Sequence, residues 1–458
     1  MKKILLFFSL ACFAFTVAAQ QNREYQQLTP SRSYRVYLHD KEGNGHSLSR
    51  PEKFLSQKAL DRRAKFGISV DEYDLPVSKK YLRKLTQAGF PIHCVSKWNN
   101  TAVVSSARED AAEALLALPF VDSVVHVYTA PDSIRVITDR DRVTDRNLSE
   151  ENRYGGAYRQ AEMIGVPRMH AYGFNGQGVT IAVIDGGFHN ADRIAGLDNV
   201  TVLGTRNFVN PGRDVYLEGE HGMMVLSCIA SNKPGIQIGT APGAQFYLLL
   251  SEDGASEFPI EEDNWCAAVE YADSLGCDIV TSSLGYTTFD DKSMSHPYWQ
   301  LDGKTFVNSR SASLCASRGI VCLNSAGNSG NDRWKLIGAP ADGDNMLAVG
   351  AVDSKERNTY FSSLGHSADG RVKPDVMAMG QACYVFDTDG EITQVNGTSF
   401  SCPILCGGVA CLMQACPDAR PEDICRAVRM SGDRAEHPDN VFGYGVPNIW
   451  KAYQLLKK

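Results

Sequence analysis

Short continuous apolar runs, rather than strictly alternating ones, recur through the second two thirds of the chain. They lie at 179–184, 246–250, 278–282, 320–323 and 346–352, and segments of helical composition such as 264–275 separate them. Continuous apolar strands that alternate with helices are typical of a parallel sheet buried on both faces. We therefore expect an α/β domain over residues 154–458, with helices on both faces of its sheet.

The pattern in the first part of the chain is different and predicts a small α+β unit over residues 25–130. Residues 34–38 alternate like a strand, and helices are predicted at 53–66 and 77–88, each followed by a glycine. Paired strands at 92–96 and 101–105, a helix at 109–118 and a strand at 121–127 complete it. This order predicts a split βαβ sandwich.

Residues 131–153 are rich in Asp, Arg, Glu and Asn and poor in apolar residues. This composition predicts a solvated linker and a region of proteolytic processing. An ordinary inter-domain loop would have the same composition, so the sequence leaves both interpretations open.

The first 19 residues have the layout of a secretory signal peptide. Lys2 and Lys3 precede an apolar run from 4 to 19, and Val17 and Ala19 supply small residues for a cut after Ala19. A transmembrane helix needs about 20 apolar residues and is the weaker interpretation. A lipoprotein-type cut before Cys12 would leave too short an apolar core. We expect an extracytoplasmic protein, periplasmic or secreted, without a membrane span.

Composition narrows the class of protein further. Of the 458 residues, 43% are hydrophobic and 22% charged, which argues against disorder, a fibre and a multi-span membrane protein. The net charge of −7 comes without a long basic run, so no nucleic-acid partner is expected. Thirteen cysteines are present; eleven remain if Cys12 and Cys94 leave with the N-terminal segments. An odd number cannot all pair within one chain, so we expect mostly buried thiols and at least one free cysteine.

Four polar residues lie at the kind of position, near the ends of strands and the starts of helices, where parallel α/β proteins carry their functional residues. Asp185 ends the apolar run at 179–184, and His221 precedes a glycine at the start of an apolar helical stretch. Ser399 follows a Gly-Thr turn at the start of a helix, and Asn328 lies in a Ser-Ala-Gly-Asn-Ser-Gly loop after a strand. Each alone is as well explained by a cap or a turn.

Taken in order, the Asp, His and Ser motifs resemble those of the subtilisin-like serine proteases, the subtilases. Further motifs extend the resemblance over about 170–455. They are Gly-Thr-Ala-Pro-Gly-Ala at 239–244, Ser-Ser-Leu-Gly at 282–285, Val-Gly-Ala-Val at 349–352, Phe-Ser-Ser-Leu-Gly at 361–365, Lys-Pro-Asp-Val at 373–376 and Gly-Tyr-Gly-Val-Pro-Asn at 443–448. Residues 34–127 resemble the inhibitor-like propeptides of the same family more loosely; a permanent N-terminal domain is the alternative.

The resemblance implies a serine endopeptidase made as a self-inhibited zymogen, which acts on peptides or proteins and binds its own propeptide. Ser399 would be the nucleophile, His221 the base, Asp185 its orienting carboxylate and Asn328 an oxyanion donor. Substrate would pair with Ser283, Leu284 and Gly285, and Ala326 and Gly327 would lie along the S1 wall. A neutral His221 is required, so we expect activity to fall below about pH 6.

Two positions depart from the family pattern. The family usually has Thr two residues after the catalytic His, where this chain has Met223, and Met after the nucleophile, where it has Phe400, with Cys402 just beyond. Neither is a reacting group, and no proposed catalytic position is substituted, which argues against a dead protease.

No cofactor is required by this chemistry, and no metal site is readable, since no C-x-x-C or H-E-x-x-H motif occurs. Many subtilases carry structural calcium, and Asp342 with Asp344, or Asp387 with Asp389, could contribute oxygen ligands, although ordinary polar loops explain these residues better.

Three other functions fit the sequence less well. An α/β-hydrolase esterase needs G-x-S-x-G and the order Ser, acid, His, which this chain lacks. Glycines at 173, 176 and 178 precede a strand instead of following one, which excludes a dinucleotide site. A non-catalytic binding protein on a subtilase scaffold remains the alternative that labelling of Ser399 would exclude.

Overall fold

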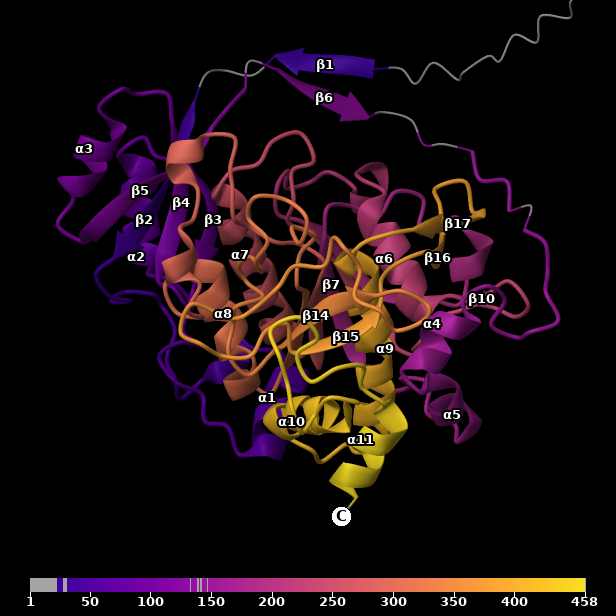
Figure 1. The fold of residues 1–458 in the computed structure, drawn as a ribbon. Helices are drawn as coiled ribbons and strands as arrows, with labels where there is room; N and C mark the ends of the chain where they lie inside the picture. The colour runs from indigo at the N-terminus through magenta and orange to yellow at the C-terminus, as the bar shows by residue number, and fades with distance from the viewer. Residues whose placement is uncertain are drawn as a thin grey trace, which may run out of the picture.

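The computed structural model describes residues 23–27, 31–131, 133–137, 140, 142–145 and 147–457. The predicted signal peptide, residues 1–19, lies outside them. The described chain forms an N-terminal α+β domain that packs on the side of a larger α/β domain (Figure 1). The fold class expected from the sequence is confirmed.

A seven-stranded parallel sheet forms the centre of the larger domain, with strand order β15-β14-β13-β12-β7-β11-β8. Its strands are β7 (Thr180–Asp185), β8 (Thr201–Asn207), β11 (Gln245–Leu250), β12 (Ile279–Ser282), β13 (Val321–Ser325), β14 (Leu347–Val352) and β15 (Val376–Met379). The five apolar runs in the sequence are five of these strands. The two-stranded pairs β9 (Asn232–Lys233) with β10 (Gln237–Ile238), and β16 (Cys383–Phe386) with β17 (Ile392–Val395), lie outside the sheet.

Alternate residues of β7 show why the strand is apolar throughout. Ile181 and Val183 belong to the hydrophobic core on the side of α6 (His221–Ala230) and α9 (Thr398–Ala415). Ala182 and Ile184 belong to a second core under α7 (Ile260–Leu275) and α8 (Val307–Leu314). Helices on both faces remove both sets of side chains from water, as a buried parallel sheet requires. The remaining helices of this domain are α4 (Tyr158–Met163), α5 (Val166–Ala171), α10 (Pro421–Ser431) and α11 (Ile449–Leu456).

The N-terminal domain has a four-stranded antiparallel sheet of order β3-β4-β2-β5, with helices on one side, as the split βαβ prediction requires. Its elements are β2 (Arg32–Leu38), α1 (Gln57–Phe66), α2 (Lys79–Gln87), β3 (Ile92–Ser96), β4 (Thr101–Ser106), α3 (Ala111–Leu116) and β5 (Val121–Thr129).

Two helices of this domain begin later than their apolar pattern predicted. The Ser56 side chain accepts a hydrogen bond from the Ala59 backbone N–H, so α1 begins at Gln57 instead of residue 53. Ser78 caps α2 through the Tyr81 N–H in the same way. Serine is a favoured N-cap because its hydroxyl satisfies a backbone donor that the first turn leaves free.

The segment between the two domains is more structured than a solvated linker. β6 (Ser133–Ile137) pairs antiparallel with β1 (Arg23–Gln27), and this ribbon runs along the outside of the molecule (Figure 1). Described residues beyond β6 contact the larger domain: Thr144 and Asn147, for example, bond to the turn between β16 and β17.

Candidate active site

Asp185 is the last residue of β7, at the edge where the parallel strands end, and its side chain is fully buried. Its Oδ1 accepts hydrogen bonds from the Gly186 backbone N–H at 2.8 Å and from His221 Nδ1 at 2.7 Å. The carboxylate therefore holds one imidazole nitrogen protonated and turned toward the sheet. The other ring nitrogen, Nε2, is left as the basic one.

His221 is the first residue of α6, and the glycine after it allows the approach to Asp185. A Cβ at Gly222 would lie 2.5 Å from the Gly187 carbonyl oxygen and 2.8 Å from Asp185 Cβ, closer than atoms can pack. The His221 side chain is 39% exposed, so its ring can meet a substrate. Burial alone would lower its pKa, but the charge and hydrogen bond of Asp185 outweigh this and raise the pKa above 6.5.

Ser399 lies in the first turn of α9, and it is 8% exposed. Its carbonyl oxygen accepts a hydrogen bond from Ser283 Oγ at 2.8 Å. The ring of the next residue, Phe400, lies 5.8 Å from the His221 ring between centroids, which brings the start of α9 beside the imidazole. The hydrogen bonds of the described side chains include none from Ser399 Oγ to His221; such bonds often form only when substrate is bound.

Asn328 is tied to the residue before Ser399. Its Oδ1 accepts hydrogen bonds from the Thr398 backbone N–H at 2.8 Å and from Thr398 Oγ1 at 3.0 Å. A backbone N–H can only donate, so the amide oxygen must face Thr398 and the NH2 group must face away from it. The amide is thus oriented as a donor next to the proposed nucleophile, which is the geometry that an oxyanion donor needs.

Ser283, Leu284 and Gly285 follow β12 directly and continue past the sheet edge. Asn324 Nδ2 donates to the Leu284 carbonyl oxygen and to the Ser325 carbonyl oxygen, both at 2.8 Å. Gly285 is exposed, whereas Ser283 and Leu284 are largely buried. The segment therefore has a fixed backbone with an open position at Gly285.

Ala326 and Gly327 lie in the same loop as Asn328. The Ala326 side chain is fully buried in a small cluster with Ile337, Ala341 and Ala348, so only its backbone can face a bound peptide. The Gly327 N–H donates to Thr398 Oγ1 at 3.2 Å, and its φ of 107° is one that residues with a side chain rarely adopt.

Two residues of this site were not singled out from the sequence for their role. Thr398 holds the Asn328 amide, and Asn324 holds the backbone at Leu284 and Ser325. Their positions could have drawn attention to them, since Thr398 adjoins Ser399 and Asn324 lies near the end of a strand, beside Ser283. Their hydrogen-bond partners, however, lie about 40 to 70 residues away in the chain.

The residues that depart from the family pattern are buried near the proposed catalytic groups. Met223 is fully buried in the larger core, and Phe400 is nearly so. The Cys402 Sγ lies 3.5 Å from Thr281 Oγ1, and burial raises the pKa of this thiol to about 12. A thiol with this pKa is neutral at physiological pH and acts as a small core residue.

Three carboxyl groups gather near the site. Glu252, Glu257 and Glu261 each offer an oxygen within 4.8 Å of the others, and Tyr286 donates its hydroxyl to Glu252 at 2.9 Å. Burial and repulsion within the cluster raise the pKa of Glu252 to about 8 and of Glu261 to about 11. Burial and repulsion from Asp290 and Glu262 raise the pKa of Glu257 to about 7. Protons therefore stabilise this group at neutral pH, and a cation would have to displace them.

Asp342 and Asp387, named above as residues that could contribute calcium ligands, have hydrogen-bond partners within the protein. Both carboxylate oxygens of Asp342 accept hydrogen bonds within the protein, from Ser309 Oγ at 2.5 Å and from the Gly303 N–H at 2.8 Å. Asp387 Oδ1 accepts from the Asp389 and Glu391 N–H groups and so closes the turn between β16 and β17. Hydrogen bonds within the protein thus account for Asp342 and Asp387 as residues that hold loops together.

One described helix, α9, is long and apolar enough to cross a membrane by length and composition alone. Most of it is buried against the sheet, where it carries Ser399 at its start. Its apolar character is explained by that core position.

Comparison with known proteins agrees with this geometry. The profile of the subtilase family matches residues 176–445, and that of the peptidase S8 propeptide domain of Bacteroidota matches residues 33–143. The chain is 28% identical to subtilisin DY of Bacillus licheniformis, over 64% of this chain and 97% of that protein. It is 29% identical to subtilisin NAT of Bacillus subtilis subsp. natto, over 58% of this chain and 65% of that protein.

Among solved structures, the MycP3 protease from the type VII (ESX-3) secretion system shares the fold. It superposes with a TM-score of 0.53 at 17% identity, over 69% of this chain and 99% of that chain. The family profile covers more than half of the sequence, and the site lies within it. The chain therefore belongs to the subtilase family of serine endopeptidases, with a propeptide domain of that family in front of its catalytic domain.

Proposed function

We propose that this protein is an exported serine endopeptidase that hydrolyses peptide bonds through Asp185, His221 and Ser399 and is made as a self-inhibited zymogen. The Asp185–His221 hydrogen bond of 2.7 Å carries the proposal, because it fixes the imidazole beside the start of α9. The apolar leader at residues 1–19 supports an extracytoplasmic location.

In the proposed reaction Ser399 Oγ attacks the carbonyl carbon of the scissile bond. His221 Nε2 takes the hydroxyl proton and later delivers it to the leaving amine, while Asp185 stabilises the imidazolium. The Asn328 NH2 group and the Ser399 backbone N–H bind the negative oxygen of the tetrahedral intermediate. Water then hydrolyses the acyl-enzyme by the same proton transfers in reverse.

Substrate binds in extended form along Ser283, Leu284 and Gly285. Their backbone continues a strand of the sheet, and an extended peptide can add to such an edge by main-chain hydrogen bonds. Gly285 gives the peptide open access to this edge. The backbone of Ala326 and Gly327 borders the same path and supplies the wall beside the P1 residue.

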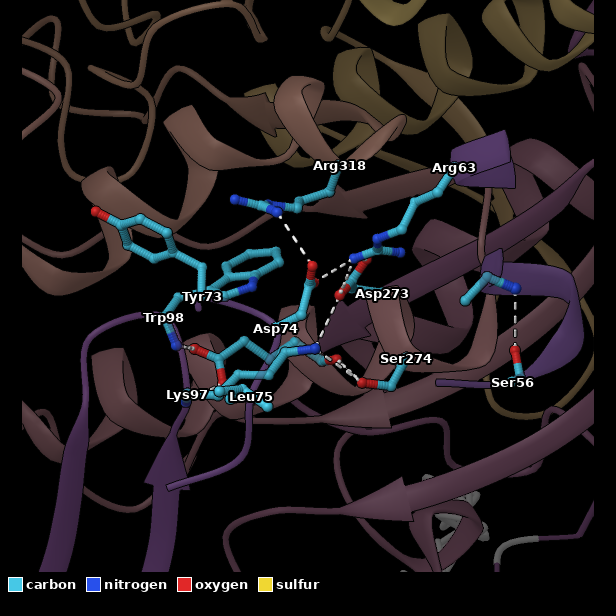
Figure 2. A network of polar contacts seen from close by, with 12 residues as sticks. Ser56, Arg63, Tyr73, Asp74, Leu75, Lys97, Trp98, Asp273, Ser274 and Arg318 are labelled. Carbon is cyan, nitrogen blue, oxygen red and sulfur yellow. Dashed lines mark hydrogen bonds and ion pairs between the residues drawn. The ribbon is translucent and has the colours of Figure 1, made fainter. Parts of the chain in front are cut away.

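The N-terminal domain is proposed to act as the inhibitor, and a buried ionic network supports its tight binding. Asp273 in α7 is fully buried, and Arg62, Arg63 and Lys97 of the N-terminal domain contact its carboxylate at 2.6 to 3.0 Å. Figure 2 shows Arg63 and Lys97 converging on Asp273 from separate segments. Three cations of the N-terminal domain thus surround one buried carboxylate of the catalytic domain.

Beside Asp273, a carboxylate of the N-terminal domain is paired with a cation of the catalytic domain. Asp74 of the N-terminal domain is also fully buried, and it contacts Arg63 of its own domain and Arg318 of the catalytic domain (Figure 2). Each domain thus contributes both a buried carboxylate and at least one cation to the interface. Such a network has little freedom to slide, since a shift of either domain would leave buried charges without partners.

Fluorophosphonate labelling of the processed protein tests the proposed function. We expect a stoichiometric adduct on Ser399, located by mass spectrometry, and none in His221→Ala or in the unprocessed Ser399→Ala chain. Absence of an adduct on Ser399 after removal of the N-terminal domain would contradict catalysis and favour a binding protein on the same scaffold.

A further inference from the structure

The chain between the two domains is anchored at both ends. On the N-terminal side, β5 is held in its sheet up to Thr129, which pairs with Arg32. The next residue still belongs to that domain, because the Ala130 N–H donates to the Ser31 carbonyl oxygen at 2.9 Å.

On the other side the anchor begins at Arg140. Its guanidinium contacts Asp192 at 2.6 Å and Asp214 at 3.1 Å, lies 5.6 Å from the Tyr216 ring, and is only 12% exposed. All three partners belong to the catalytic domain. Arg140 is therefore held by the catalytic domain and not by the propeptide.

The described residues after Arg140 continue this attachment. The Thr144 N–H donates to the Asp389 carbonyl oxygen at 2.7 Å, and Asn147 exchanges two hydrogen bonds of 2.6 Å with Gly390 and Ile392. The Glu150 N–H donates to the Gly235 carbonyl oxygen at 2.6 Å. We call residues 140–153 the strap. Its Thr144 and Asn147 bond to the turn between β16 and β17, and its Glu150 bonds to Gly235.

β6 lies between these anchors, and it differs from both. In the part of the chain that the structure describes, β1 is its one strand partner, so β6 belongs to neither domain's sheet. A two-stranded ribbon leaves the second edge of each strand without a ladder partner. Extended backbone with a free edge is the form in which a peptide can add, by strand addition, to the substrate segment at residues 283–285.

We propose that β6 is the maturation site of this zymogen: a peptide bond within Ser133–Ile137 is the first bond cut, and the strap stays with the mature enzyme. This rests on the proposed function, since the protease is the catalyst. Water adds across the bond, which leaves a carboxylate on the propeptide fragment and a new amine on the mature chain. The Ser399 acyl-enzyme is consumed, and the catalyst returns unchanged.

The test follows the wild-type full chain by time-resolved intact mass and N-terminal sequencing. The first new amino terminus is expected at residue 134, 135, 136 or 137, so that the mature mass includes the whole strap. A first terminus anywhere else overturns the proposal. Fluorophosphonate labelling of Ser399 in the same sample separates the two hypotheses: a labelled enzyme cut elsewhere contradicts only the site, whereas an unlabelled one contradicts the proposed function.

A proline variant checks that the strand itself is recognised. Val136→Pro removes a backbone N–H in β6 and disfavours extended pairing, so we expect the first cut to slow at least tenfold. Leu148→Pro is the matched control, because Leu148 lies in the strap and is 92% exposed. Processing of Val136→Pro at the wild-type rate and position would contradict recognition of β6 as a strand.

Discussion

The amide oxygen of Asn328 accepts hydrogen bonds from both the backbone N–H and the hydroxyl of Thr398, the residue before the proposed nucleophile. The proposed oxyanion donor is thereby fixed to the residue next to the proposed nucleophile, and not only to the scaffold. The position of one cannot shift without moving the other.

Replacing Asn328 should therefore slow the chemical step. We expect Asn328→Ala to lower kcat by about 10²–10³-fold with little change in KM, because an oxyanion donor acts mainly in the transition state. Thr398→Val removes one of the two bonds and should have a smaller effect of the same kind. Asn331→Ala, at an exposed position in the same loop, is the control. An equal loss in the control would assign the effect to loop structure.

The pH dependence should reflect the Asp185–His221 pair. Because Asp185 raises the pKa of His221, the base stays protonated to higher pH than a free imidazole, and kcat/KM should fall as pH drops through a value above 6.5. The structure thus moves the limit upward from the pH of about 6 expected from the sequence. In Asp185→Asn we expect about a 10⁴-fold lower kcat, since the imidazole loses its orienting partner. A pH–rate profile with an acid limit below pH 6 would contradict this assignment.

Removing the negative charge of Asp273 should weaken the attachment of the propeptide. In the Ser399→Ala full chain, Asp273→Asn leaves three cations around a neutral amide in a buried site, and loss of one partner of such a pair costs about 3–5 kcal/mol. Urea unfolding should show the N-terminal domain released at lower denaturant. Asp110→Asn, whose partner Arg108 forms an exposed pair with it, should behave like the parent chain.

Mild acid should not release the propeptide. The three cations hold the pKa of Asp273 well below 3.8, so its contribution to binding is present above that value and is lost only in much stronger acid. Burial raises the pKa of Glu270, which accepts bonds from Ser96, Lys97 and Trp98, to about 7; its contribution is full below 4.5 and fades as pH rises through 7. Size-exclusion chromatography of the cut complex should find it intact at pH 5 as at pH 7.5. Dissociation at pH 5 would show that other groups control release.

The cysteines should all titrate as thiols. The twelve cysteines within the described residues form no disulfide, and eleven of them are buried. Thiol counting on the mature enzyme should give eleven groups in denaturant without reductant and almost none in the native state, because burial raises the pKa of most of these thiols. A count reduced by two or more would indicate disulfides.

The main strands, and the placement of the four proposed site residues at the ends of strands and the starts of helices or loops, could be predicted because each depends on local sequence. A continuous apolar run needs only its own residues to indicate a buried strand, and Asp185 and Ser399 stand at the ends of such elements. β8 was missed because Thr201–Asn207 is mostly exposed at the sheet edge, so no apolar run marks it.

The contacts across the interface could not be predicted in the same way. Arg62, Arg63 and Lys97 look like ordinary surface charges of helices and turns, and their burial is decided by Asp273, more than 170 residues later in the chain. The attachment of the strap could not be predicted for the same reason. Its polar composition predicted a solvated segment, whereas its side chains bond to a turn some 240 residues away in the chain.

The face of α7 that meets the propeptide has a kinetic consequence. Glu262, Asp263, Glu270 and Asp273 all contact groups of the N-terminal domain there, so departure of that domain leaves a strip of negative potential on the mature enzyme. A fragment that carries the complementary cations would be steered back by long-range attraction, at a rate that falls with ionic strength. Activation in dilute salt would therefore be slowed by recapture, and the persistence of activity would depend on how quickly the released fragment is destroyed.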